Sequence, residues 1–198
     1  MPNNKTKLLD EIAIYYFEKL AEYGFTPRGV YWSVEEIQMV RFARLWKIID
    51  PKKPQFFLKD LGCGYGALMN DLRDSCANIT YHGMDASHEM IKDAEESSAA
   101  VDQVSFIISA EPDEVANDSV VSDIVNVRLG RMDADYLRST LDVLDSTSRL
   151  GFSINCLTSY SDKGKKRDYF YYADPCRLFD LFKHRNTRQD ALLHDAGL

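Results

Sequence analysis

The chain has 198 residues, of which 45% are apolar, and this is enough material for one domain with a sizeable hydrophobic core. Its formal net charge of -7 and its pI near 5.1 argue against a broad nucleic-acid surface, because phosphate binding needs clustered lysines and arginines. No apolar stretch approaches the roughly 20 residues that cross a bilayer. We therefore expect a single domain over residues 1–198 that binds neither nucleic acid nor membrane.

The spacing of the cysteines and histidines indicates the redox compartment of the protein and whether it binds a metal. The four cysteines show no Cys-x-x-Cys spacing, and no cationic segment followed by an apolar one opens the chain. These features favour a reduced, cytoplasmic protein. The four histidines are scattered without metal-ligand spacing, so no metal site is expected.

Two amphipathic helices are expected at the start of the chain. Apolar residues recur at four-residue spacing over residues 7–23. Ser33 and Glu36 form a capping box, which predicts a second helix over Val34–Ile49. Residues 1–50 are therefore expected to form a helical cap or lid that precedes the sheet.

From residue 51 onward, the pattern predicts a mostly parallel α/β sheet flanked by helices, a Rossmann-like fold, because strand and helix signals alternate. The expected strands lie near 55–60, 79–85, 104–108, 119–127 and 150–157. The expected helices lie near 65–75, 87–98, 132–145 and 175–184.

The most informative motif follows the first expected strand and reads Asp60-Leu61-Gly62-Cys63-Gly64-Tyr65-Gly66. Glycines at these positions let the backbone bend sharply and approach a ligand closely. With Ala67 the spacing also fits the dinucleotide fingerprint, so NAD binding is an alternative. Asp60 argues against it, because a carboxylate repels a pyrophosphate but accepts hydrogen bonds from a cationic amino-acid end.

This motif resembles the first motif of the class I S-adenosylmethionine (SAM) dependent methyltransferases. A second segment, Gly83-Met84-Asp85-Ala86-Ser87, resembles the second motif of the same family. Asp85 lies 21 residues after Gly64, the offset at which an acid reaches the ribose hydroxyls of a bound nucleoside. The resemblance implies the cofactor SAM and the product S-adenosylhomocysteine (SAH).

The resemblance also implies roles for individual residues. Gly62 and Gly64 would approach the methionine portion of SAM, Asp60 would help to hold its amino group, and Asp85 would bind the ribose. Three residues that follow the third strand would border the adenine: Ser109, Ala110 and Glu111. The remaining cofactor contacts would come from Cys63, Ala86 and Met90.

The helical cap offers two further candidates for the cofactor site. A lid needs a clamp for a carboxylate and an aromatic cover, and Arg28 and Trp32 lie between the two expected helices. An arginine between a proline and a glycine has no evident packing role. We therefore expect Arg28 and Trp32 to contact SAM.

Acceptor contacts are expected after the fourth strand. Asn126 and Arg128 alternate with valines on that expected strand and so share one face, either toward the acceptor or toward solvent. Methyl transfer from an activated sulfonium can proceed by alignment alone. If a base is used, the candidates are Tyr15, His82 and Tyr160. The acidic charge and the lack of an Asn-Pro-Pro-Tyr motif favour a small molecule as acceptor.

The family's sheet has seven strands, and residues 190–198 read as the sixth, so the seventh is expected to be missing. An unpaired edge predicts self-association, such as a homodimer, or a frayed C-terminus. The function we expect is SAM-dependent methyl transfer to oxygen or nitrogen of a small molecule. The alternatives are a catalytically inert SAM-binding or scaffold protein and an NAD-dependent oxidoreductase.

Overall fold

A five-stranded parallel sheet forms the centre of the computed structural model, which describes residues 14, 22, 24, 35–48, 55–73, 78–112, 114–126 and 134–185. The strands are β1 (Phe56–Leu61), β2 (Ile79–Asp85), β3 (Val104–Ile108), β4 (Ala116–Ser122) and β5 (Ser148–Asn155). Their order is β3-β2-β1-β4-β5 and every pair is parallel. The predicted Rossmann-like α/β fold is confirmed, and the order reverses between β1 and β4.

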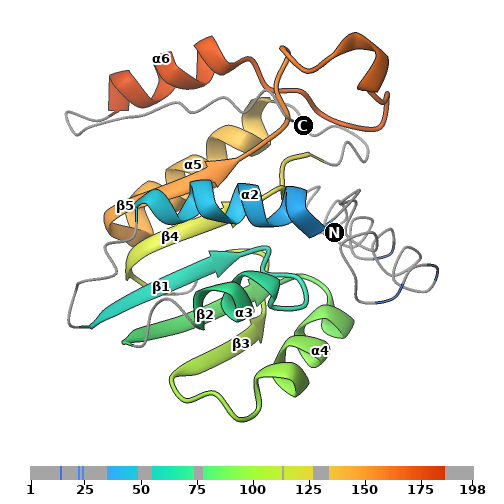
Figure 1. Cartoon of the computed structure of the whole chain (residues 1–198). Helices are drawn as coiled ribbons and strands as arrows, with labels where there is room; N and C mark the ends of the chain where they lie inside the picture. The colour runs from blue at the N-terminus through green and yellow to red at the C-terminus, as the bar shows by residue number, and fades with distance from the viewer. Residues whose placement is uncertain are drawn as a thin grey trace, which may run out of the picture.

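Helices cover both faces of this sheet (Figure 1). The helices are α2 (Glu35–Leu45), α3 (Ala67–Arg73), α4 (His88–Ser98), α5 (Ala134–Thr147) and α6 (Pro175–Arg185), with short 3-10 turns η2 (Trp46–Ile48) and η3 (Lys163–Lys165). Figure 1 shows α2, α3 and α4 on one face, α5 on the other, and α6 beyond β5. None of the described helices is both long and apolar enough to span a bilayer.

Alternation along the strands divides the core between the two faces. Leu58 of β1 and Tyr81 of β2 are register partners, and both are fully buried against the α2, α3 and α4 side. On the opposite face, Leu61 and Met84 pack in one cluster with Leu144 of α5. Asp60 follows Leu58 by two positions and therefore belongs to the α2, α3 and α4 face.

Side-chain oxygens cap the first turns of α4 and α6. The Ser87 hydroxyl accepts a hydrogen bond from the Met90 amide at 3.3 Å and caps α4. At α6, an oxygen of Asp174 accepts from the Cys176 amide at 2.9 Å, and Pro175 is the first helical residue. The starts of α4 and α6 agree with the helices expected near 87–98 and 175–184.

The fourth strand differs from its prediction. It was expected over 119–127, but β4 spans Ala116–Ser122. The strand starts earlier because Asp118 is buried in the sheet, where it pairs with Leu58. It ends earlier because Asp123 has a φ of +62°, which is incompatible with a strand.

Several other expectations lie outside the described residues. The cap helix over residues 7–23 is described only at Ile14 and Glu22, which are both helical. The capping hydroxyl of Ser33 and the expected sixth strand near residues 190–198 are not among the described residues.

Candidate functional site

The glycine turn follows β1 at the sheet edge where the carboxyl ends of the parallel strands meet. Gly62 has a φ of +78° and Gly64 a φ of +56°, a region that glycine enters without strain. An added Cβ at Gly62 would lie 2.0 Å from Cγ2 of Ile124, whereas the nearest atom at Gly64 would be Sδ of Met90 at 4.0 Å. Gly62 therefore serves close packing, and Gly64 leaves its side of the turn open to a ligand.

The turn is joined to β2 through the backbone. The amides of Gly62 and Cys63 both donate to the Met84 carbonyl, at 2.7 and 3.0 Å. Burial, together with the negative charges of Asp85 and Asp60, raises the pKa of the Cys63 thiol well above its usual value. Cys63 is therefore a packed neutral thiol rather than a nucleophile.

Asp85 ends β2 directly beside this turn. Its Oδ2 accepts a hydrogen bond from the Gly64 amide at 2.9 Å, and its Oδ1 accepts from the Ser87 amide at 2.9 Å. Burial raises the pKa of Asp85, while backbone hydrogen bonds from Ser87, Gly64 and Ala86 lower it. Each carboxylate oxygen has a second lone pair, so the group is fixed in place and can still accept from a ribose hydroxyl.

Asp60 has a more unusual environment than Asp85. Its Oδ2 accepts from the Tyr81 hydroxyl at 2.6 Å, and its Oδ1 is buried without a hydrogen-bond partner among the described residues. Burial raises the pKa of Asp60 to about 7, against the lowering effect of the Tyr81 hydrogen bond. The site therefore contains a buried carboxyl group whose Oδ1 has no hydrogen-bond partner among the described residues.

The residues expected to border an adenine follow β3 next to Asp85. The Ser109 amide donates to the Asp85 carbonyl at 2.9 Å, which continues the ladder between β2 and β3. The Ser109 hydroxyl donates to the Glu111 carbonyl at 2.6 Å and closes a tight turn around Ala110. These three residues thus lie at the same sheet edge as Asp85.

A second polar group lies where β4 and β5 end. One terminal nitrogen of Arg41, on α2, contacts both oxygens of Asp123 at 2.8 and 3.0 Å. Asn126 donates to Asp123 and accepts from the Leu157 amide at 2.8 Å. The Asp123 amide donates to Asn155 at 2.8 Å. This group, defined by Arg41, Asp123, Asn126 and Asn155, is called the network half of the edge.

Helix α2 reaches both parts of the edge. Gln38 is buried and its side-chain amide lies 3.4 Å from the Tyr65 hydroxyl in the glycine turn. One helical turn later, Arg41 holds Asp123. Helix α2 is therefore fixed to the turns that follow β1 and β4.

The expected placement of Asn126 on the fourth strand needs correction. Asn126 and Arg128 were expected to alternate on the fourth strand, but β4 ends at Ser122 and Asn126 lies in the turn that follows it. Its side chain is buried and engaged in the network described above, because Asp123 turns the chain inward. Arg128 lies outside the described residues.

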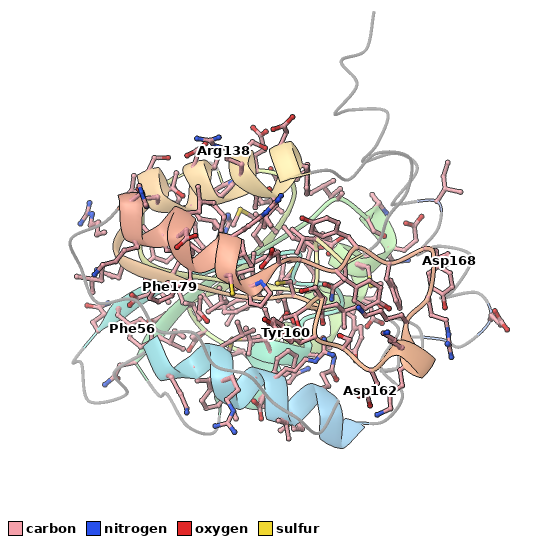
Figure 2. All side chains as sticks on the ribbon, turned by 90° about the horizontal axis from the view of Figure 1, so that it is seen from above. Phe56, Arg138, Tyr160, Asp162, Asp168 and Phe179 are labelled. Carbon is pink, nitrogen blue, oxygen red and sulfur yellow. The ribbon has the colours of Figure 1, made fainter. Side chains whose placement is uncertain are left out.

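Two of the three candidate bases, His82 and Tyr160, lie on different elements of the described structure. His82 lies within β2, on the opposite face from Asp60, and its Nδ1 lies 2.7 Å from the Ser105 hydroxyl. Tyr160 is exposed on the loop after β5, whose Asp162 and Asp168 lie in Figure 2 at the end of the molecule opposite Phe56. The third candidate base, Tyr15, and the two expected SAM contacts from the cap, Arg28 and Trp32, lie outside the described residues.

Sequence reasoning missed three residues at this edge: Tyr81, Arg41 and Asp123. The sequence did contain a signal for Tyr81. The hydroxyl of a tyrosine in a buried strand needs a hydrogen-bond partner, and Asp60 lies on the expected neighbouring strand. The sequence contained no such signal for Arg41 and Asp123, because 82 residues separate them.

Comparison with known proteins gives consistent results. A family model described as a methyltransferase domain matches residues 59–148. The Mycobacterium tuberculosis protein Rv1506c, whose name assigns it to the methyltransferases, is 47% identical over 155 residues, which cover 77% of this chain and 93% of that protein.

Solved structures share the fold at low sequence identity. The magnesium protoporphyrin IX methyltransferase ChlM of Synechocystis PCC 6803, with bound SAH, matches with a TM-score of 0.63 at 16% identity and covers 90% of this chain and 87% of its own. DhpI in complex with SAH matches with a TM-score of 0.61 at 15% identity, covering 89% and 86%. At these identities the likeness establishes the fold and leaves the substrate open.

Proposed function

Because the chain belongs to the class I SAM-dependent methyltransferase family, we propose that it transfers the methyl group of SAM to oxygen or nitrogen of a small molecule and releases SAH. The observation that carries the proposal is the junction of β1 and β2. There Gly64 leaves space for a ligand, and its amide fixes the Asp85 carboxylate.

The residues present fit the cofactor in three respects. Gly64 lets the backbone approach the methionine portion, Asp85 keeps lone pairs for the ribose hydroxyls, and Asp60 offers negative charge to an ammonium. When bound, SAM supplies the electrophilic methyl group. The protein then has to align the acceptor and exclude water, which needs no catalytic triad.

A small-molecule acceptor is supported by the acidic balance of the chain, with 31 acidic and 24 basic residues besides four histidines. The free thiols of Cys63, Cys156 and Cys176 are consistent with a cytoplasmic location. The second candidate is a catalytically inert SAM-binding protein. Such a protein would make the same contacts with SAM and would form no SAH.

Calorimetric titration of the full chain with SAM, SAH and NAD tests the cofactor. We expect SAM and SAH to bind and NAD not to bind. The Asp85→Asn variant should bind SAM at least about tenfold more weakly, because one amide of the turn then faces an NH2 group and a ribose acceptor is lost. Asp102→Asn makes the same chemical change at an exposed turn residue and should bind like the wild type.

A second measurement separates an enzyme from an inert binder. Slow formation of SAH in the presence of a surrogate acceptor would exclude the inert reading. Binding of NAD without binding of SAM would instead favour the oxidoreductase.

A further inference from the structure

Asp60 carries a buried carboxyl group directly before the glycine turn. Asp60 is 2% exposed on β1 and Tyr81 is fully buried on β2. The Tyr81 hydroxyl donates to Oδ2 of Asp60 at 2.6 Å, and Oδ1 receives no hydrogen bond from any residue that the structure describes. The tyrosine thus fixes one oxygen of Asp60 and leaves the other without a partner.

The charges around Asp60 do not compensate for its burial. The titratable groups on the surrounding elements are Tyr81 and Asp85 on β2, Cys63 in the glycine turn, Asp118 on β4 and Arg41 on α2. Arg41 is held by Asp123, and within the described part of the chain no cation forms an ion pair with Asp60. Lys59 precedes Asp60 on β1 but lies on the opposite face of the sheet, where its ammonium donates to the Glu114 carbonyl.

A carboxyl group in these surroundings favours its neutral form. Burial raises the pKa of Asp60 to about 7, and the negative charge of Asp85 contributes to the increase. Burial also raises the pKa of Tyr81 well above its usual range, so its hydroxyl keeps its proton and remains a donor. The proton of neutral Asp60 then resides on Oδ1, because Oδ2 is the oxygen that accepts the hydrogen bond from Tyr81.

We propose that Tyr81 is a positioning residue for SAM and that cofactor binding drives the ionisation of Asp60. The ammonium of the methionine portion, seated at the glycine turn, is the positive charge that this buried carboxyl lacks. This inference rests on the proposed function, and it extends that function by assigning a role to Tyr81 and a proton to the binding step.

The proton balance of this step is simple. Below pH 7.5 most SAM carries a protonated amino group, because an α-amino group titrates near 7.7–8.0. Neutral Asp60 meets this ammonium, loses the proton on Oδ1 to the buffer and becomes a carboxylate. Binding of one SAM therefore releases about one proton at pH 6 and fewer as the pH approaches 7.5.

Calorimetry in two buffers with different ionisation enthalpies measures this release. At pH 6 the wild type should release close to one proton per SAM, and Asp60→Asn should release close to none. The affinity of the wild type for SAM should rise more than about tenfold from pH 5.5 to pH 7.5, because ionisation of Asp60 no longer has to accompany binding. The affinity of Asp60→Asn should be nearly flat over this range.

The Tyr81→Phe variant tests the positioning role. It removes the hydrogen bond that stabilises the Asp60 carboxylate, so the pH profile of SAM affinity should move to higher pH by about one unit, and SAM should bind about fivefold more weakly at pH 7. Tyr136→Phe is the matched control, because Tyr136 is a half-buried tyrosine on α5 whose hydroxyl bonds to Thr140. Its profile should match that of the wild type.

The outcomes separate this inference from the function on which it rests. A wild type that binds SAM without releasing a proton at pH 6 overturns the inference and leaves the methyltransferase function standing. So does a Tyr81→Phe variant whose pH profile matches the wild type. A wild type that binds no SAM at any pH overturns both.

Discussion

The two halves of the carboxyl edge satisfy their polar groups differently. In the network half, both oxygens of Asp123 are held by Arg41 and the Asn126 side chain is bonded on both sides. In the cofactor half, defined as the glycine turn with Asp60 and Asp85, Oδ1 of Asp60 is buried without a described partner.

This difference indicates which half is built for a ligand. A buried polar atom without a partner costs free energy, and Oδ1 of Asp60 lies next to the glycine turn, where a ligand can supply that partner. The network half instead joins α2, β4 and β5, because the ion pair of Arg41 and Asp123 and the hydrogen bond of Asp123 to Asn155 connect these elements. We therefore expect mutations in the network half to affect stability, and mutations in the cofactor half to affect binding and its pH dependence.

The largest expected effect comes from a pair of glycine substitutions within the turn. Gly62→Ala places a Cβ 2.0 Å from Ile124 at a φ of +78°, so the protein should lose about 3 kcal/mol of stability or fail to fold. Gly64→Ala meets no atom closer than 4.0 Å and should cost only about 1 kcal/mol, for its φ of +56°.

Urea denaturation and SAM titration of these two variants separate packing from ligand approach. Gly64→Ala should remain folded and lose most SAM binding, because its Cβ fills the open side of the turn. Equal stability of the two variants would contradict the packing role of Gly62. Unchanged SAM binding by Gly64→Ala would contradict the location of the cofactor.

The ion pair in the network half should give the next largest effect. The side chains of Arg41 and Asp123 are only 16% and 17% exposed, so Asp123→Ala leaves a largely buried guanidinium without this partner. We expect a loss of about 2 kcal/mol by urea denaturation. Asp162→Ala breaks an exposed pair with Lys165 and should change stability by less than about 0.5 kcal/mol. A similar loss in both variants would contradict the difference in burial.

The long-range pair of Arg41 and Asp123 shows a limit of what the sequence alone can predict. The glycine turn and Asp85 were predictable because each is a local motif in which spacing alone sets the geometry. The pair of Arg41 and Asp123 depends on how α2 lies across β4, which no local pattern encodes.

The fourth strand shows a second limit. The sheet extends the strand back to Ala116 and buries Asp118, which pairs with β1 and β5, although an acidic residue is not typical of a buried strand. The strand ends at Asp123, whose positive φ is uncommon for a residue other than glycine. Tertiary pairing therefore outweighed the local hydrophobic pattern.

The pH dependence of stability tests the cofactor half without a ligand. The pKa of Asp60 is about 7 in the folded protein and near 3.8 when unfolded, so the folded state binds the extra proton between these values. Stability from this group is therefore full below about pH 4 and is lost as the pH rises through 7. Relative to Asp60→Asn, the wild type should lose about 2 kcal/mol between pH 5 and pH 8. Urea denaturation at each pH measures this, and a constant difference between the two proteins would contradict the raised pKa.

The smallest expected effect concerns Ser87, which borders the cofactor half. Ser87→Ala removes the cap of α4 and should cost about 1 kcal/mol. Its backbone amide still donates to Asp85, so SAM affinity should change less than about twofold. Ser97→Ala, at an exposed position of the same helix, should be close to neutral by urea denaturation. A large loss of SAM affinity in Ser87→Ala would mean that the side chain, rather than the backbone, orients Asp85 and that stability and binding are not separable at this edge.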